Sequence, residues 1–64
     1  MFRIEIITKQ GEKYCHYADA LKVATAYAKA NFAIEDVEMV SVFQCEYDGH
    51  PRSDKGELIW EKKR

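Results

Sequence analysis

Hydrophobic and polar residues alternate over residues 2–8 with the period of two that is typical of a β-strand. The apolar side chains fall on one side at Phe2, Ile4 and Ile6, and on the other at Ile7. The run stops where Gly11 suits a tight turn, and strand-like residues resume over residues 13–17. A short, glycine-containing connection between two such runs predicts a β-hairpin.

A change to helical periodicity follows. Asp19 is a suitable N-cap because its carboxylate can accept hydrogen bonds from the free amides of a helix. The segment from Ala20 to about Phe32 is rich in alanine and free of Gly and Pro, which favours a helix. We expect its buried side to hold Ala20, Ala24, Tyr27, Ala28 and Asn31, flanked by Leu21 and Val23. Tyr27 is the large residue of this side, so we expect it to be the main anchor of the helix. Lys22, Ala26 and Lys29 lie opposite and should face water.

Two further strands are expected after the helix. Val37 to about Tyr47 forms the longest apolar run, residues 48–56 form a loop with the only proline, and Glu57 to Glu61 forms the last strand. The predicted order is β-β-α-β-β in one domain, residues 1–64. This is an α+β fold, in which a single helix packs on one face of an antiparallel four-stranded sheet.

The predicted strands carry apolar residues on both faces. In the third strand, Val40 and Val42 fall opposite Met39, Phe43 and Cys45. Either set could meet the helix, and a β-bulge could bury parts of both. A sheet covered on one face only should be polar on the other. The surplus of apolar residues therefore predicts a surface that contacts a partner.

Composition narrows the classes of function. The chain is 47% hydrophobic and 33% charged with a net charge of −1, which is typical of a folded domain. Nucleic-acid binding requires an excess of Lys and Arg on one surface, so it is not expected here in spite of several aromatic residues. No stretch is apolar enough to span a bilayer, and no signal peptide is evident, so we expect a cytoplasmic protein. The strand that follows Met1 directly and the charged final residues are typical of a complete small gene product.

No motif indicates catalysis, a cofactor or a metal. Cys15, His16, Cys45 and His50 are possible ligand types, but their spacing matches no zinc motif. Cys15 and His16 are adjacent in a predicted strand, so their side chains point to opposite faces. The nucleophile and phosphate-loop motifs of enzymes are absent. We therefore expect no enzyme activity and free thiols at both cysteines, which could become bridged by oxidation only if their strands were neighbours.

The loop after the third strand is the segment most suited to recognition, since loops carry binding residues on rigid scaffolds. Our candidates for protein binding are Tyr47, Asp48, His50, Arg52 and Lys55, together with Trp60 of the last strand. The alternative is an ordinary solvated connection, with Trp60 in the core. An acidic surface from Glu35, Asp36 and Glu38 is a second candidate, with a solvated face as its alternative.

The segments YADALKVATAYAKANF and IEDVEMVSV place an Asp-led, alanine-rich helix between two strands. This layout resembles small phage-encoded inhibitors, such as the host RNA polymerase inhibitor of T7-like phages and several small anti-CRISPR proteins. The resemblance covers about two-thirds of the chain and transfers no site residue. It implies a non-catalytic inhibitor that docks on a larger host protein in the bacterial cytoplasm. The alternative is a homodimer that pairs two uncovered sheet faces.

Overall fold

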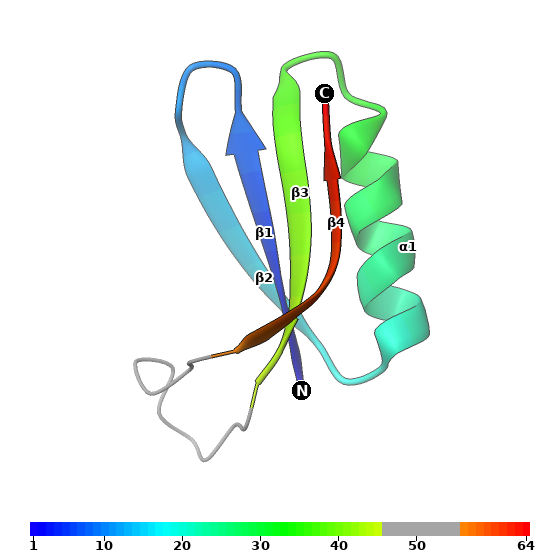
Figure 1. Cartoon of the computed structure of the whole chain (residues 1–64). Helices are drawn as coiled ribbons and strands as arrows, with labels where there is room; N and C mark the ends of the chain where they lie inside the picture. Colours follow the sequence, from blue (N-terminus) through cyan, green and yellow to red (C-terminus); the bar gives the residue numbers. More distant parts are fainter. Residues whose placement is uncertain (46–55) are drawn as a thin grey trace.

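The computed structural model describes residues 1–45 and 56–64, which form one antiparallel sheet with a helix on one of its faces (Figure 1). The elements are β1 (Phe2–Thr8), β2 (Lys13–Ala18), α1 (Leu21–Phe32), β3 (Val37–Gln44) and β4 (Glu57–Lys63). The predicted β-β-α-β-β layout is confirmed. The strand order is β2-β1-β3-β4, so β1 and β3 are central and β2 and β4 form the edges.

The first hairpin closes through a tight turn. The Thr8 amide donates to the Glu12 carbonyl at 2.9 Å, and the Gly11 amide donates to the Thr8 carbonyl at 3.0 Å. Gly11 adopts a φ of 89°, which is strained for residues with a Cβ atom and explains the glycine at this position. The strand after the turn reaches Ala18, one residue beyond the predicted end.

The core lies between α1 and the middle of the sheet. Ile4 pairs with Val42 and Ile6 pairs with Val40, and all four side chains are buried. This register answers the question that the sequence left open, because Val40 and Val42 face the helix. Met39 and Phe43 consequently lie on the face without a helix.

Small residues on α1 allow the helix to approach the sheet closely. Ala24 and Ala28 have no exposed surface, whereas Tyr27 is 37% exposed. The prediction that Tyr27 anchors the helix is therefore wrong. Tyr27 instead lies toward β2, where its ring contacts the ring of His16 at a centroid distance of 4.8 Å. The alanine pair takes the central position because the separation between backbone and sheet leaves no room for a large side chain there.

The N-terminus of α1 also differs from the prediction. Ala20, not Asp19, is the N-cap residue, with φ −122° and ψ 140°, and no side chain caps the helix. The chain leaves β2 at Ala18, and the helix begins only at Leu21. The capping preference of Asp19 therefore does not set the start of the helix.

Arg64 caps the opposite end of α1. Its guanidinium donates to the carbonyl oxygens of Phe32 at 2.6 Å, Ile34 at 2.9 Å and Val37 at 2.6 Å. The same group lies 4.5 Å from the centroid of the Phe32 ring. A cation at a helix C-terminus is favourable, because the last carbonyls have no partner within the helix. The end of the chain is thereby bound to the turn between α1 and β3.

The last two strands pair with an irregularity. The register shifts between Val42, which pairs with Trp60, and Phe43, which pairs with Leu58. β4 extends to Lys63, two residues past the predicted end, because Lys63 still pairs with Met39. β3 ends at Gln44, so Cys45 lies outside the strand that was predicted to continue to about Tyr47, and residues 46 and 47 lie outside the described residues.

Candidate functional site

The face of the sheet that α1 does not cover carries three rows of side chains that run across the strands. The register places Tyr17, Arg3, Phe43 and Leu58 in one row, which we call the aromatic row. The next row, the polar row, holds Cys15, Glu5, Ser41 and Glu61. The third row holds Lys13, Ile7, Met39 and Lys63. The open face is thus neither uniformly hydrophilic nor continuously apolar.

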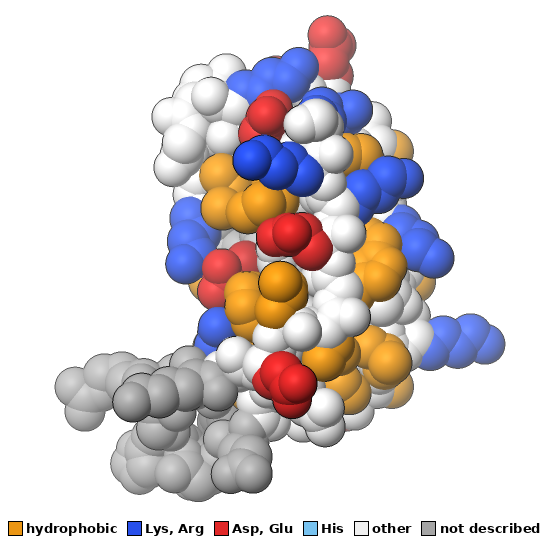
Figure 2. All heavy atoms as spheres, in the orientation of Figure 1, with side chains coloured by type: hydrophobic (Ala, Val, Ile, Leu, Met, Phe, Trp, Pro, Cys, Tyr) orange, Lys and Arg blue, Asp and Glu red, His pale blue; other side chains and the backbone are white. Residues whose placement is uncertain are grey.

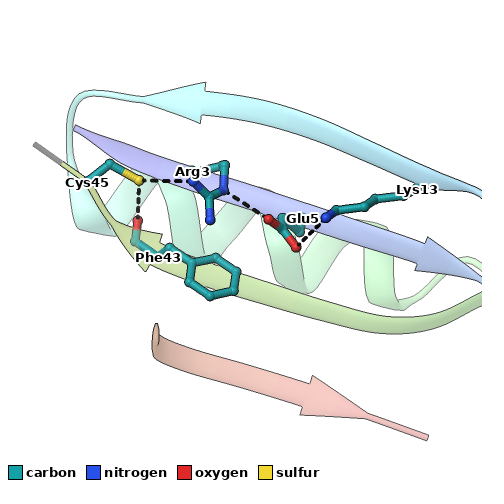
Figure 3. Close-up of polar contacts among 5 residues, drawn as sticks. All are labelled: Arg3, Glu5, Lys13, Phe43 and Cys45. Carbon is teal, nitrogen blue, oxygen red and sulfur yellow. Dashed lines mark hydrogen bonds and ion pairs between the residues drawn. The ribbon is translucent and has the colours of Figure 1, made fainter. Parts of the chain in front are cut away.

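Arg3 is the most constrained residue of the aromatic row (Figure 3). Its Nε donates to Oε2 of Glu5 at 2.9 Å, and Lys13 lies 3.3 Å from the other oxygen of this carboxylate. The Arg3 guanidinium lies 4.7 Å from the centroid of the Phe43 ring, and its Nη1 donates to Sγ of Cys45 at 3.6 Å. These contacts hold a positive, planar group in one orientation on the open face.

The Arg3–Glu5 pair is well shielded for a pair on an uncovered face. Each side chain is only 14% exposed. An ion pair held at such low exposure is less screened by solvent than an ordinary surface pair. Sequence reasoning did not single out this pair. A signal was present, because residues two apart in a strand share a face.

The ends of the aromatic row project into solvent. Tyr17 is 42% exposed and Leu58 is 47% exposed, while Arg3 and Phe43 between them are half-buried. On the side of the molecule shown in Figure 2, hydrophobic side chains form several areas with charged side chains between them. A contact surface on this domain would therefore combine apolar and charged groups.

The sequence-predicted site residues fall into two groups. Tyr47, Asp48, His50, Arg52 and Lys55 lie outside the described residues. They connect the end of β3 to the start of β4, and Phe43 and Leu58 of the aromatic row are near these ends. Trp60 pairs with Val42 on the helix-facing side and packs partly buried against the core. This position supports the alternative in which Trp60 contributes mainly to folding.

The two cysteines are too far apart to form a bridge within one chain. Cys15 is exposed on β2, and Cys45 is buried beyond the end of β3. β1 separates these strands, and Cys45 lies four residues beyond Ser41, which is in the same row as Cys15. Strand spacing and rise place the two Cα atoms about 16 Å apart, whereas a disulfide requires at most about 7 Å. Adventitious bridging of these thiols is therefore excluded in the folded monomer.

The side chains considered as possible metal ligands do not converge in the described part of the chain. Cys15 pairs with Glu5 on the open face and His16 contacts Tyr27 on the helix face, so the two side chains diverge as expected. Within residues 1–45 and 56–64, no group of three or more His, Cys, Asp or Glu side chains could hold a metal ion. No helix in the described part of the chain is long and apolar enough to cross a membrane.

The acidic candidates lie around the connection between α1 and β3. Glu35 and Asp36 are exposed, and Glu38 is half-buried at the start of β3. The backbone carbonyl of Asp36 accepts a hydrogen bond from the Lys9 amide at 2.8 Å, which ties this connection to the first hairpin. The arrangement is that of a solvated turn held through its backbone.

Comparison with known proteins identified no related protein. No protein-family model, no characterised protein and no solved structure matches this chain significantly. The functional argument therefore depends on the geometry described above.

Proposed function

We propose that this chain is a small, non-catalytic protein-binding domain, and that the aromatic row is the centre of its contact surface. The supporting observation is the combination of two exposed apolar side chains, Tyr17 and Leu58, with the oriented guanidinium of Arg3 between them. Tyr and Arg are the residue types that most often dominate binding energy at protein interfaces.

Preorganisation supports this assignment. Ordering a long side chain on binding costs about 0.5–1.5 kcal/mol. The Arg3 guanidinium is already held by Glu5 and by the Phe43 ring, so much of that cost is met during folding. A partner with a carboxylate or an aromatic ring opposite this row would match both the charge and the stacking surface.

The interface must extend beyond the row itself. A standard interface buries about 800 Å² on each partner, which is about a fifth of the 4470 Å² accessible surface of this molecule. A few side chains cannot supply that area. The sequence candidates between β3 and β4 adjoin the aromatic row along the chain, and Tyr47 and Arg52 are the residues with which we propose to test this extension.

The finer form of the proposal is an inhibitor that blocks a larger host protein in the cytoplasm by occupying its surface. Its motivation is the resemblance in layout to small phage-encoded inhibitors. Such a protein needs a rigid contact surface and no catalytic group. An inhibitor of this type would reduce the activity of its captured partner in proportion to the amount of domain added, with saturation at a fixed stoichiometry.

Affinity capture with matched variants tests the surface. Tagged wild-type protein, the double variant Tyr17→Ala with Leu58→Ala, and Ile34→Ala are used in parallel on lysate of the encoding cell or its host. Ile34 is the control because it is 53% exposed and outside the aromatic row. We expect the wild type and the control to retain the same partner and the double variant to lose at least about tenfold in affinity. Equal capture by all three proteins would refute the aromatic row as the contact surface.

A homodimer formed by two open faces is the alternative function from a different class. The described residues give it less support, since Glu5 and Glu61 of the polar row lie across the middle of that face. Two stacked faces would bury Glu61 together with the Arg3–Glu5 ion pair, and removing charged groups from water is costly even when they are paired. Sedimentation of Leu58→Ala separates the two functions, because this residue lies on the open face and away from β2, and its loss would weaken a face-to-face dimer.

A further inference from the structure

The two edges of the sheet differ in how well they are protected against pairing with another strand. At β4, a register shift interrupts the pairing with β3, and the strand ends in Glu61, Lys62 and Lys63. Bulges and charged side chains are the usual means of keeping an edge from pairing. The middle of β2, from Tyr14 to Tyr17, has neither a register shift nor an Asp, Glu, Lys or Arg residue.

The hairpin determines which backbone groups of β2 point outward. Thr8 and Glu12 form a hydrogen-bonded pair beside the turn. Hydrogen-bonded and non-hydrogen-bonded pairs alternate along antiparallel strands. Lys13 and Cys15 therefore stand in non-hydrogen-bonded pairs with β1, and their amide and carbonyl groups point away from it. In the part of the chain that the structure describes, no other strand lies beyond this edge.

We propose that the β2 edge pairs with the β2 edge of a second copy of this chain, in an antiparallel arrangement about a two-fold axis at Cys15. This inference shares Tyr17 with the aromatic row but depends on the backbone edge of β2, so changes at Tyr14 and His16, which lie outside the row, test it separately. Outward-pointing backbone groups must meet each other, which places the axis at a residue and not between two residues, and Tyr14, Cys15 and His16 are the positions near the middle of the strand. An axis at Cys15 brings all three outward-pointing residues, Lys13, Cys15 and Tyr17, into hydrogen-bonded pairs, whereas an axis at Tyr14 or His16 brings only two of them into such pairs.

The side chains match in this register. Lys13 lies opposite Tyr17 of the second copy, so no like charges meet and a cation faces an aromatic ring. On the helix-facing side, Tyr14 lies opposite His16 of the second copy, which is a favourable aromatic cross-strand pair. The two Cys15 residues face each other in a hydrogen-bonded pair and exchange backbone hydrogen bonds. The strand is thus complementary to itself.

The helices leave room for this pairing. A continuous two-fold sheet places both copies of α1 on the same face, and each lies mainly over β1 and β3. Strand spacing then separates the two helix axes by about 19 Å, well beyond the 8–10 Å of packed helices. The exposed side chains of Tyr14, Val23 and Tyr27 line the space between them. In the monomer these side chains are 50%, 58% and 37% exposed, respectively, and the second copy would bury part of this surface.

Cys15 provides a position-specific test. Paired Cα atoms in a hydrogen-bonded antiparallel pair are about 5.5 Å apart, within the range of a disulfide. With the axis at Tyr14 or His16, the two Cys15 Cα atoms would be about 8 Å apart, too far for a bridge. Under reducing conditions, sedimentation of the full chain from about 5 to about 500 µM should show a rise to twice the monomer mass. Mild oxidation of the same samples should then give a covalent dimer with a Cys15–Cys15 linkage, identified by peptide mass spectrometry.

Two variants control the cross-linking. Cys45→Ser retains Cys15 and should still form the covalent dimer. Cys15→Ser should still form the non-covalent dimer but should not become cross-linked. Because the linkage is also mapped in the wild-type chain, the test does not depend on the folding of either variant. A monomer mass over the whole concentration range overturns the proposal. A dimer that does not cross-link through Cys15 also overturns it, because that dimer uses another surface.

A charge exchange tests the same edge without oxidation. Tyr14→Lys with His16→Lys places lysines opposite each other across the two-fold, and Tyr14→Glu with His16→Glu does the same with carboxylates. Both sites are exposed, so the monomer should fold. We expect each double variant to be monomeric alone and an equimolar mixture to form a heterodimer. Failure of the mixture to associate contradicts β2–β2 pairing. If the wild type is monomeric and these substitutions abolish capture of a different protein, the β2 edge pairs with a strand of that protein. This result would also overturn the proposed pairing of two copies.

Discussion

Replacement of Arg64 by methionine tests how the end of the chain stabilises the fold. The substitution keeps an unbranched stem near the Phe32 ring and removes three hydrogen bonds to the carbonyls of Phe32, Ile34 and Val37. Water can replace the guanidinium at the first two carbonyls, which are exposed, but less readily at Val37, whose residue is 4% exposed. The loss should therefore be smaller than three full hydrogen bonds.

The magnitude follows from two contributions. One partly buried hydrogen bond contributes about 1 kcal/mol net, and a cation at a helix C-terminus contributes about 0.3–1 kcal/mol. We expect the free energy of unfolding of Arg64→Met to fall by about 1–2 kcal/mol. In a domain of this size, that loss lowers Tm by about 4–16 °C. Arg64→Lys should recover only the helix-terminus part, because an ammonium cannot span three carbonyls.

Urea unfolding at low micromolar concentration measures this loss. The fluorescence of Trp60, the only tryptophan, reports on the core that it contacts. Lys63→Met is the matched control, since Lys63 is the preceding residue, has the same charge and lies on the open face. It should change stability by less than about 0.5 kcal/mol. The reasoning is refuted if Arg64→Met unfolds at the same urea concentration as the control, or if Arg64→Lys restores the full stability.

Three further substitutions test other parts of the structure by the same unfolding measurement. Gly56→Ala should destabilise the domain by about 1–3 kcal/mol, because a Cβ at residue 56 would lie 2.6 Å from the Cβ of Phe43 and 2.8 Å from Sγ of Cys45. If the variant unfolds at the wild-type urea concentration, the chain around residue 56 moves aside and the expected clash is absent. Ala20→Asp should stabilise by about 0.5–2 kcal/mol, since it places a carboxylate at the uncapped N-cap position. Asp19→Ala should leave the free energy of unfolding unchanged, because Asp19 does not cap the helix. A loss of about 1 kcal/mol in this variant would show that Asp19 is the N-cap after all. Ile4→Val should cost about 0.5–1.5 kcal/mol as a buried methylene is removed, and an unchanged midpoint would contradict the packing of the core.

The predicted elements correspond closely to the observed ones, because each depends on local pattern. Alternation over residues 2–8, a glycine at the turn and an uninterrupted helical segment are properties of neighbouring residues. They act before any long-range contact forms. The β-β-α-β-β order and the antiparallel pairing within the first hairpin follow from them directly.

The candidate site was predicted only in outline. Apolar residues on a second face were expected, and Tyr17, Phe43 and Leu58 lie there. Their alignment with Arg3 in one row depends on the register between strands far apart in the chain, which no local pattern specifies. The residues that the sequence favoured, between β3 and β4, lie outside the described residues, so their role stays a prediction.

By itself, then, the sequence determined the number and order of the elements, since periodicity requires only near neighbours, while it left open which face of β3 meets the helix. Tertiary structure alone decided the pairing of β1 with β3, the burial of Ala24 and Ala28 in place of Tyr27, and the capping of α1 by Arg64. The burial of the two alanines depends on how closely the helix approaches the sheet. That distance is a compromise among all the side chains between the two layers, so it cannot be assigned from any single segment.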